Sequence, residues 1–394
     1  MDVFLGEWLN LLLRWAHMVV AIGWIGTSFY FMALDYTLSR REKLNEGVLG
    51  TAWQVHGGGF YHVEKYTVAP ATLPEVLHWF KWEAYLTWVT GFGLLVVQYY
   101  FHAEAFLIDP GVMPLNAWQA AAISAASLAA GWFIYDGLCR SKVGENTVLL
   151  ALSVFALILI AAVLYTKVFS GRGAFVHVGA LVGTIMAINV FGVIIPNQKK
   201  MIAQMIAGQT PETRFGAIGK QRSIHNNYLT LPVLLMMVSQ HYPFLFSHPH
   251  SWLVVALILL SGGLIRHVLN RVDAGDDWNR YGWSVPVAAI ALIAAIYVTA
   301  PQARPAAGGA AVSDAEALAI SKKHCANCHA RDPVHPAFKE PPKNVSLETA
   351  AELRRYARLI VAQTVQNRAM PLGNQTGMTD DERAKLGRWV EGLK

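Results

Sequence analysis

The sequence predicts an all-α membrane protein, with a bundle of eight transmembrane helices over residues 1–300 and a small C-terminal domain over residues 313–394. Two observations support this fold class. Of the 394 residues, 54% are hydrophobic and only 15% are charged, and this composition is too apolar for a soluble protein of this length. The apolar residues also gather in runs of roughly the 20 residues that a bilayer-crossing helix needs.

Eight apolar runs are expected to form the helices of the bundle. The first is not a cleavable signal peptide, because it lacks a basic n-region and its apolar stretch is too long. The sixth is the weakest candidate, because Pro232 and Gln240 interrupt it. The runs cover residues 8–34, 82–101, 117–138, 148–168, 175–196, 228–246, 250–270 and 281–300.

The distribution of Lys and Arg predicts the orientation of the bundle. Cytoplasmic loops of membrane proteins are enriched in these residues. The loops after the first, third, fifth and seventh runs carry Arg40, Arg41, Lys43, Lys65, Lys81, Arg140, Lys142, Lys199, Lys200, Arg214, Lys220, Arg222, Arg271 and Arg280. The opposite side carries Arg172 alone. We therefore expect a multi-pass protein of the bacterial inner (cytoplasmic) membrane, with both termini in the periplasm. No basic run with interleaved aromatic residues indicates a nucleic-acid partner.

A linker and three helices are expected after the last run. Small residues punctuated by Pro and Gly fill residues 301–312, which is typical of a linker between domains. The expected helices of the tail lie near residues 313–324, 347–367 and 379–392.

A short motif in the tail indicates a covalently bound haem. Cys325 and Cys328 are separated by two residues, and His329 follows directly, which is the attachment signature of a c-type haem. A zinc site or a redox dithiol is the alternative. A zinc site needs further Cys or His ligands at short spacing; His324 and His335 are near, but no second Cys pair exists.

The axial ligands of this haem c are expected to be His329 and Met370. A thioether as sixth ligand raises the haem potential, which suits an electron acceptor. Met378 is the second choice, because Thr379 and Glu382 form a capping-box pattern that places it against a helix start. The three helices around this motif predict a small class I cytochrome c domain in the periplasm.

The membrane part contains ionisable residues that indicate a second cofactor, haem b. Arg14 and His17 lie three positions apart and thus on one helix face, where His17 would bind iron and Arg14 would pair with a propionate. His177 and His241 are the candidates for the opposite ligand. The alternative is that Arg14 extends to the headgroups and that each His is a hydrogen-bond partner between helices.

Two polar clusters on the cytoplasmic side are the candidate substrate site. A loop of three glycines and two aromatic rings offers backbone N–H groups and a stacking surface; a flexible turn is the alternative. The second cluster gathers cationic and amide groups, or is merely a positively charged helix cap. The first cluster contributes His56, Gly58, Phe60 and Tyr61, and the second contributes Lys220, Gln221, Arg222 and Asn226.

These stretches resemble the membrane-bound urate oxidases that carry a C-terminal cytochrome c. The resemblance covers nearly the whole chain. The matching stretches are residues 14–17, 24–26, 56–66, 77–85, 195–198, 220–231, 241–243 and 265–267 with Asn189, and, less specifically, 325–329 and 370–379.

The resemblance implies oxidation of urate to 5-hydroxyisourate. Electrons would pass to the fused haem c and on to a downstream cytochrome c or terminal oxidase, not directly to oxygen. Because water adds at C5, a general base is needed, and His225 or Glu64 is expected to serve. Two other functions remain open: a quinol:cytochrome c reductase, and a membrane carrier of haem or metal.

Overall fold

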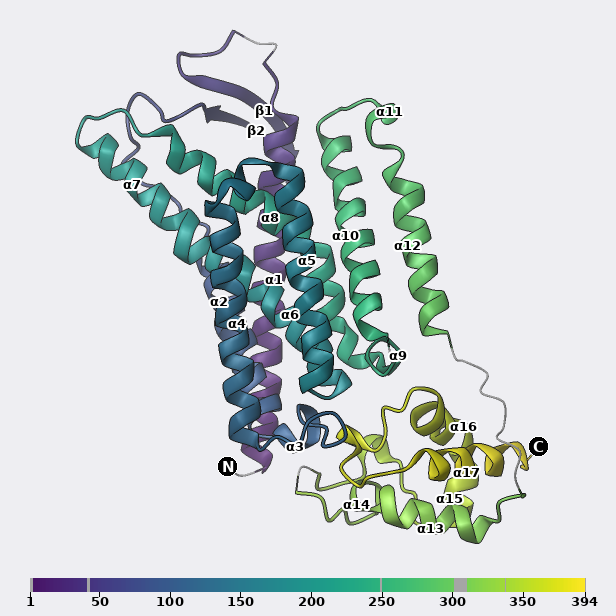
Figure 1. Cartoon of the computed structure of the whole chain (residues 1–394). Coiled ribbons are helices and arrows are strands. Elements are labelled where there is room, and N and C mark those ends of the chain that lie inside the picture. Colours follow the sequence, from purple (N-terminus) through teal and green to yellow (C-terminus); the bar gives the residue numbers. More distant parts are fainter. Residues whose placement is uncertain (1–2, 41–42, 249, 301–309, 337, 394) are drawn as a thin grey trace.

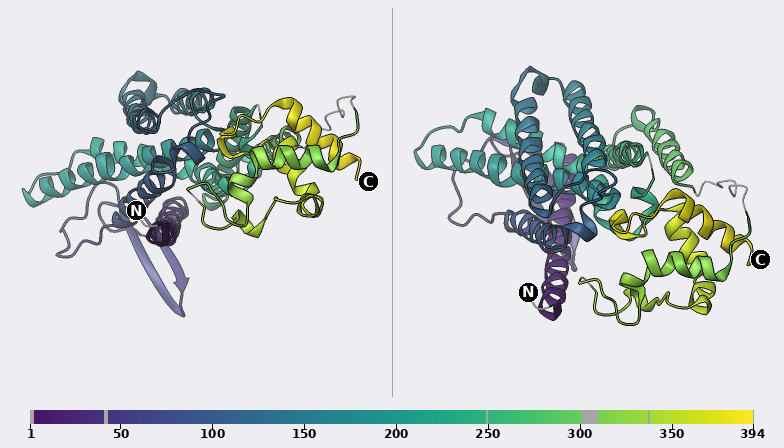
Figure 2. Two further views of the ribbon diagram at one scale, coloured as in Figure 1. Left: turned by 90° about the horizontal axis from the view of Figure 1, so that it is seen from below. Right: turned by 60° about the horizontal axis from the view of Figure 1, so that its bottom comes forward.

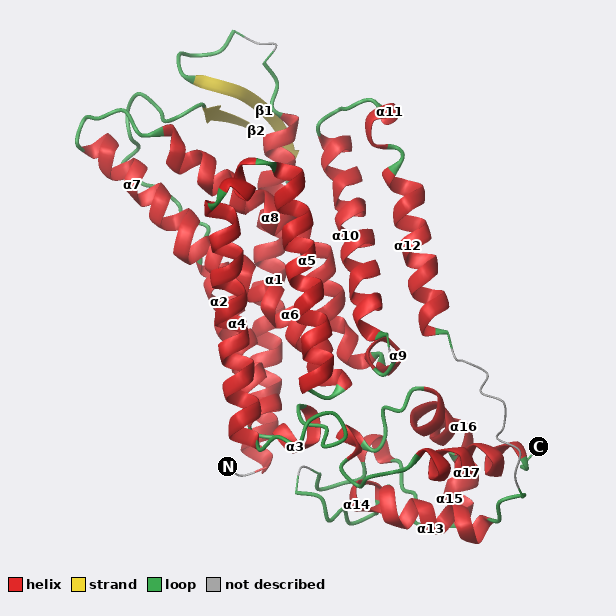
Figure 3. Cartoon of the chain, in the orientation of Figure 1, coloured by secondary structure: helices red, strands yellow, loops and turns green. Residues whose placement is uncertain are grey.

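The structure, a computed structural model, describes residues 3–40, 43–248, 250–300, 310–336 and 338–393. It consists of a bundle of long helices with a smaller helical tail domain at one end (Figures 1 and 3). The long helices are α1 (Val3–Thr37), α2 (Trp82–Leu95), α4 (Ala117–Arg140), α5 (Thr147–Val168), α6 (Gly171–Ile188), α7 (Ile195–Ile206), α8 (Thr213–Val238), α10 (Ser251–Asp273) and α12 (Ser284–Thr299).

Short elements connect or extend these helices. A π-helical segment, Val96–Tyr100, continues α2, and another, Asn189–Ile194, joins α6 to α7. The remaining elements are α3 (Ala103–Phe106), α9 (Pro243–Phe246), α11 (Trp278–Tyr281) and 3₁₀ turns at Lys142–Glu145 and Ser239–His241.

Six helices among the described residues are long and apolar enough to cross a membrane, which is consistent with a membrane protein. The helix over 171–206 is central, because 61% of its most apolar stretch is buried, against 17–44% for the others. The six are Phe4–Thr37, Ala117–Arg140, Thr147–Val168, Gly171–Ile206, Ser251–Asp273 and Trp278–Thr299. The expected second and sixth spans correspond to α2 and α8, which pack against α1 and α6, and against α6 and α10. For these two, membrane crossing stays a prediction.

The boundary expected for the sixth span is wrong. The apolar run predicted a start at residue 228, but α8 begins at Thr213, so residues 220–227 belong to a helix and not to a loop. Hydropathy did not indicate this start because the first half of α8 is polar and its buried groups find partners on other helices. Pro232 lies against α10, where a Cβ added to Gly262 would be 2.8 Å from its Cδ.

The loops expected on the cytoplasmic side lie together at one end of the bundle (Figure 1). We call this the hairpin end, and the opposite end, which holds the start of α1 and faces the tail, the tail end. The connections after α1, α4, α7 and α10 all reach the hairpin end. Arg41 lies outside the described residues.

The all-α expectation misses one β-hairpin. Strands β1 (Val48–His56) and β2 (Gly59–Tyr66) pair antiparallel, and Figure 2 shows the hairpin projecting from the bundle. Gly57 and Gly58 have φ of +59° and +79°, as a two-residue hairpin turn requires. The glycines that indicated an anion-binding loop therefore serve to reverse the chain.

The tail domain contains helices at the three expected places. The capping box predicted at Thr379 and Glu382 is present, and equivalent boxes start the other two helical stretches at Ser313 and Thr349. Residues 301–309 of the expected linker lie outside the described residues. The helices are α13 (Asp314–His324), α14 (Ala326–His329), α15 (Ala350–Arg355), α16 (Ala357–Ile360), continued by a π-helical segment to Gln366, and α17 (Asp380–Glu391).

Candidate functional site

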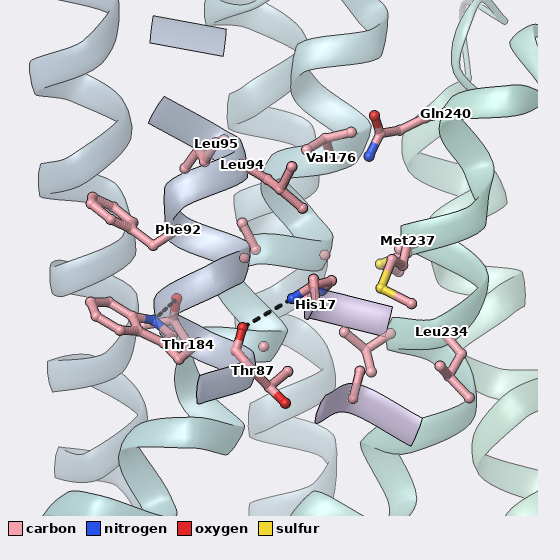
Figure 4. Close-up of a pocket in the computed structure, with 18 of the residues that line it drawn as sticks. His17, Thr87, Phe92, Leu94, Leu95, Val176, Thr184, Leu234, Met237 and Gln240 are labelled. Atoms are coloured by element: carbon pink, nitrogen blue, oxygen red, sulfur yellow. Dashed lines mark hydrogen bonds between the residues drawn. The ribbon is translucent and has the colours of Figure 1, made fainter. Parts of the chain in front are cut away.

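A cavity of about 540 Å³ lies between α1, α2, α6 and α8 (Figure 4). Most of its lining is aliphatic or aromatic, which is typical of a site for a largely apolar ligand or cofactor. Its few polar side chains come from the expected haem b residues and their neighbours. They include Arg14, His17, Gln98, Gln240 and His241.

The hydrogen bonds of His17 leave one ring nitrogen free. Nδ1 lies 3.1 Å from the carbonyl oxygen of Thr87 and 3.1 Å from Oγ1 of Thr90, and Figure 4 shows the bond to Thr87. Since a carbonyl oxygen can only accept, Nδ1 carries the proton and Nε2 keeps its lone pair. Metal-bound histidines usually have this arrangement. A Cβ at Gly91 would lie 2.9 Å from the His17 ring, so glycine makes room for it.

Arg14 lines the same cavity one helical turn from His17. Its Nε donates to Oδ1 of Asn10 at 2.6 Å, and its Nη2 donates to Oε1 of Gln98. Both partners are neutral, so the positive charge of Arg14 is not neutralised by these bonds. A carboxylate at this edge of the cavity, such as a haem propionate, would find a cation there.

The structure does not support His177 as an iron ligand. Its side chain is fully buried, and both ring nitrogens are engaged, Nε2 with Oγ of Ser124 at 2.6 Å and Nδ1 with the carbonyl oxygen of Gly173 at 2.7 Å. This histidine joins α6 to α4. The other candidate, His241, follows α8 and lines the cavity together with His17.

A buried polar network connects α4, α8 and the π-helical segment after α6. Arg222, with 2% of its side chain exposed, pairs with Asp136 at 2.6 Å. Nδ2 of Asn189 donates hydrogen bonds to the Tyr135 hydroxyl, at 2.9 Å, and to Oδ1 of Asn226, at 3.0 Å. Asp136 also pairs with Arg140 at 2.6 Å through its other oxygen. Because Arg222 is already engaged by this carboxylate, it is less available to an anionic substrate than the sequence indicated.

His225, one of the two expected bases, borders this network. Its Nδ1 lies 2.7 Å from the Tyr135 hydroxyl. The next residue, Asn226, donates a hydrogen bond of 2.9 Å to the carbonyl oxygen of Met186, and Met186 lines the cavity. Tyr135 and Asp136 are not among the site residues that the sequence predicts. The signal was the single acidic residue in the apolar run 117–138.

The structure places the two expected halves of the substrate site apart. Phe60 and Tyr61 are 77% and 54% exposed on the hairpin, and His56 and Gly58 are exposed at its tip. Two interactions hold the hairpin to the second half of α1: an ion pair between Lys65 and Asp35, and a hydrogen bond from the Tyr30 hydroxyl to Gln54. The segment 220–227 instead bonds to α4 and its following turn, to α10 and to the start of the second π-helical segment.

The remaining members of the two halves follow the same division. Glu64 accepts hydrogen bonds from Asn45 at 3.0 Å and Tyr66 at 3.2 Å, both near the hairpin. Gln221 donates 2.9 Å to the carbonyl oxygen of Gly144, and Lys220 is exposed. Among the described residues, no hydrogen bond or ion pair joins the hairpin to residues 220–227.

The model of the urate oxidase N-terminal family matches residues 3–300. The chain belongs to this family. No curated protein and no solved structure matches the chain. Membership indicates urate-related oxidation for the helical bundle, and the cavity and the buried network both lie within the matched residues.

The tail of this urate oxidase family member lies outside the match and holds the Cys325–His329 motif. Nδ1 of His329 lies 2.8 Å from the carbonyl oxygen of Val345, so Nε2 is again the nitrogen left for a metal. Cys325 and Cys328 are free thiols, as covalent attachment of haem requires. These residues fit a haem c.

The two methionines considered as sixth ligand differ in their surroundings. Met378 is 3% exposed and packs in the tail core with Leu386 and Trp389. Met370 is only half-buried, and its carbonyl oxygen accepts a hydrogen bond from Arg383 at 2.7 Å. Met370 is therefore better placed to leave its thioether available.

The alternatives to haem c find less support in the tail. His324, a possible zinc ligand, binds Oγ1 of Thr376 at 2.7 Å and lies 3.1 Å from Glu382. Desolvation raises the pKa of the Cys325 thiol to about 11, whereas redox dithiols have a lowered pKa. No group of three or more His, Cys, Asp or Glu side chains in the described part of the chain is arranged to hold a metal ion.

Proposed function

We propose that this chain oxidises urate to 5-hydroxyisourate in the helical bundle and passes the electrons to a haem c on its tail. The observation that carries the proposal is the joining of two parts in one chain. The urate oxidase family match covers residues 3–300, and the Cys325–His329 motif follows it. An oxidase that gave its electrons directly to oxygen would have no need of this tail.

The reaction requires an electron acceptor and a base. Urate and one water molecule give 5-hydroxyisourate, two protons and two electrons, so the new oxygen at C5 comes from water. His225 is the base that the geometry favours, because it lies in a buried polar network next to a residue that lines the cavity. Glu64 is on the hairpin and is not joined to that network.

Two haem groups would carry the electrons. A haem c held by Cys325, Cys328, His329 and Met370 supplies reversible one-electron chemistry when bound. The cavity residues His17 and His241 would hold a haem b, with Arg14 at its edge. A relay is useful because the hydrocarbon core is about 30 Å thick, and the cavity lies between the polar network and the tail end.

The proposal places the chain in the bacterial inner membrane, with the hairpin end in the cytoplasm and the tail in the periplasm. The loops rich in Lys and Arg at the hairpin end support this orientation, as does the periplasmic location of haem c attachment. Urate would enter from the cytoplasm. A downstream cytochrome c or a terminal oxidase would reoxidise the tail.

The test is anaerobic reduction of the purified protein. We expect urate to produce the reduced α-band of haem c without oxygen, and to incorporate ¹⁸O from labelled water into the product. The Cys325→Ala/Cys328→Ala double variant is the control, because it keeps the bundle and loses covalent haem. Failure of urate to reduce the wild-type haem, or stoichiometric peroxide in air, would overturn the proposal.

One observation favours a second function. The mainly apolar lining of the 540 Å³ cavity also suits the ring and tail of a quinol. The same anaerobic experiment separates the two functions, because a quinol:cytochrome c reductase would be reduced by a quinol and not by urate. A carrier of haem or metal would be reduced by neither.

A further inference from the structure

A second buried arginine in the bundle lacks a carboxylate partner. Arg266 on α10 is 3% exposed, and its guanidinium carbon lies 4.0 Å from the centroid of the Phe29 ring on α1. Its Nη2 is buried and has no hydrogen-bond partner. In the described part of the chain it makes no ion pair, whereas Arg222 pairs with Asp136.

The hydrogen bonds around Arg266 have a fixed direction. A guanidinium can only donate, so Oδ1 of Asn227 on α8 accepts from Nε of Arg266. Nδ2 of Asn227 must then donate, and it does so to Oδ1 of Asn270 at 3.0 Å. Asn270 is fully buried, and its Nδ2 makes no hydrogen bond of good geometry, although its side chain interacts with the Tyr228 hydroxyl.

The free groups of this cluster are therefore all donors. Arg266 and Asn270 lie one turn apart on the same face of α10, and both bind Asn227. One positive charge and two unsatisfied buried N–H groups are costly without an acceptor. Asp273, two turns further along α10, attracts Arg266 electrostatically but forms no ion pair with it in the described part of the chain. The missing partner of the free donors must be negative, or at least rich in acceptors.

The cluster also lies close to the cavity. On α1, Phe29 follows Ile25 by one helical turn, and Ile25 lines the cavity. On α8, Asn227 precedes the cavity residue Val233 by less than two turns. Both steps lead toward the hairpin end. A molecule held at Arg266 would thus be next to the cavity on the side opposite the tail.

We propose that Arg266 and Asn270 bind the anionic, carbonyl-bearing edge of the substrate. This assignment rests on the proposed function, in which the substrate is urate. The urate anion carries its charge over a planar ring whose carbonyl oxygens accept hydrogen bonds, and a guanidinium fork suits such an edge. Arg266 thereby takes the role of substrate cation that was predicted for Arg222.

Anaerobic equilibrium dialysis of the reduced, full-length protein against labelled urate tests the assignment, because reduced haems accept no electrons and the bound urate stays unchanged. In Arg266→Gln the dissociation constant should rise roughly ten- to a hundredfold, as expected for loss of a charged hydrogen bond. The matched control is Arg271→Gln on the same helix, because Arg271 already pairs with Asp276 at 3.1 Å; its affinity should stay within about twofold of wild type. The haem c spectrum checks folding.

A neutral purine separates binding of the anion from a structural effect. Wild type should prefer urate over hypoxanthine, and Arg266→Gln should lose most of that preference. If Arg266→Gln does not fold, the Asn270→Asp variant tests the assignment instead. It provides an internal counter-charge for Arg266, so it should raise the melting temperature and abolish urate binding.

The outcomes distinguish this assignment from the proposed function. Urate binding by wild type with unchanged affinity and preference in Arg266→Gln, or with unchanged affinity in Asn270→Asp, would overturn the assignment alone. That result would mean that water satisfies the free donors. Absence of urate binding by the wild-type protein would overturn the proposed function, and this assignment with it.

Discussion

The side-chain amide of Gln375 donates a hydrogen bond to the backbone carbonyl of Glu104. This bond joins the tail to the α3 segment at the tail end of the bundle. Gly373 lies in the same loop, where an added Cβ would be 2.6 Å from the carbonyl oxygen of Ile108. Because Met370 lies only three positions before Gly373, the proposed haem ligand is close to the surface by which the tail contacts the bundle.

Replacing Gly373 with Val should separate the tail from the bundle. The new side chain would collide with the Ile108 carbonyl, and each loss of about 1.4 kcal/mol of docking free energy lowers the docked-to-undocked ratio tenfold. We expect slower reduction of haem c by urate in stopped-flow measurements, with the haem c spectrum unchanged.

Gly377→Val is the matched control for that variant. Gly373 and Gly377 both have positive φ, +53° and +63°, but a Cβ at Gly377 meets nothing within 4 Å. It therefore adds the same kind of backbone strain without the collision. The cysteine pair Glu104→Cys/Gln375→Cys should form a disulfide on oxidation when Gly373 is retained, and should not form it when Gly373→Val is added. Equal reduction rates in both glycine variants would contradict the docking role.

Met370→Ala and Met378→Ala should have opposite effects on the tail. Met370→Ala should abolish the weak Met–iron charge-transfer band and leave the haem covalently attached. Met378 is buried in the tail core, so its truncation should keep the band but lower the unfolding free energy by about 2–5 kcal/mol. Survival of the band in Met370→Ala would identify another sixth ligand.

His17→Ala and His177→Ala should separate ligation from packing. We expect His17→Ala to lose the non-covalent haem b that acid–acetone removes from wild type, and to keep haem c. His177→Ala should retain haem b, because both nitrogens of His177 already bind protein groups. Its effect should instead be a lower melting temperature. An acid–acetone extract of wild type without haem would refute the haem b site.

Glu382 should make the tail sensitive to acid. A hydrogen bond from Lys323, with a second from the N–H of Thr379, holds the pKa of Glu382 well below its usual range. A carboxyl with a lowered folded pKa stabilises the fold above its unfolded pKa, and this stabilisation is lost as the pH falls.

Thermal melting of the tail within the haem-loaded, full-length protein checks this expectation. The melting temperature of wild type should fall as the pH drops below about 4.5, the usual range of Glu, and Glu382→Gln should show a smaller fall. Glu391→Gln, at the exposed end of the same helix, is the control and should behave as wild type. Identical acid profiles for Glu382→Gln and wild type would show that these hydrogen bonds do not stabilise the tail.

The fold was predictable where local pattern determines it. Long apolar runs indicated the helices, and the capping box at Thr379 indicated where the last helix starts. The hairpin was also within reach, because Gly57 and Gly58 separate two stretches rich in aromatic and β-branched residues. We interpreted those glycines as a binding loop and so missed a turn that needs positive φ.

The candidate site was less predictable because its contacts are distant in sequence. Nothing near Arg222 indicates that Asp136 pairs with it, and nothing near Arg266 indicates that its partner is an amide. Individual polar residues in an apolar helix can be recognised from sequence. Whether the chain supplies a counter-charge depends on tertiary packing: Asp136 pairs with Arg222, whereas no ion pair of Arg266 is found among the described residues, although each arginine keeps one buried nitrogen without a hydrogen bond.

The attachment of the tail to α12 has a consequence for dilution. α12 ends at Thr299 and α13 begins at Asp314, so the tail stays within a short tether of the α3 surface. Two sites joined this way meet at an effective concentration on the order of millimolar. The docked fraction therefore does not change when the protein is diluted, and a free copy of the tail would compete only near that concentration.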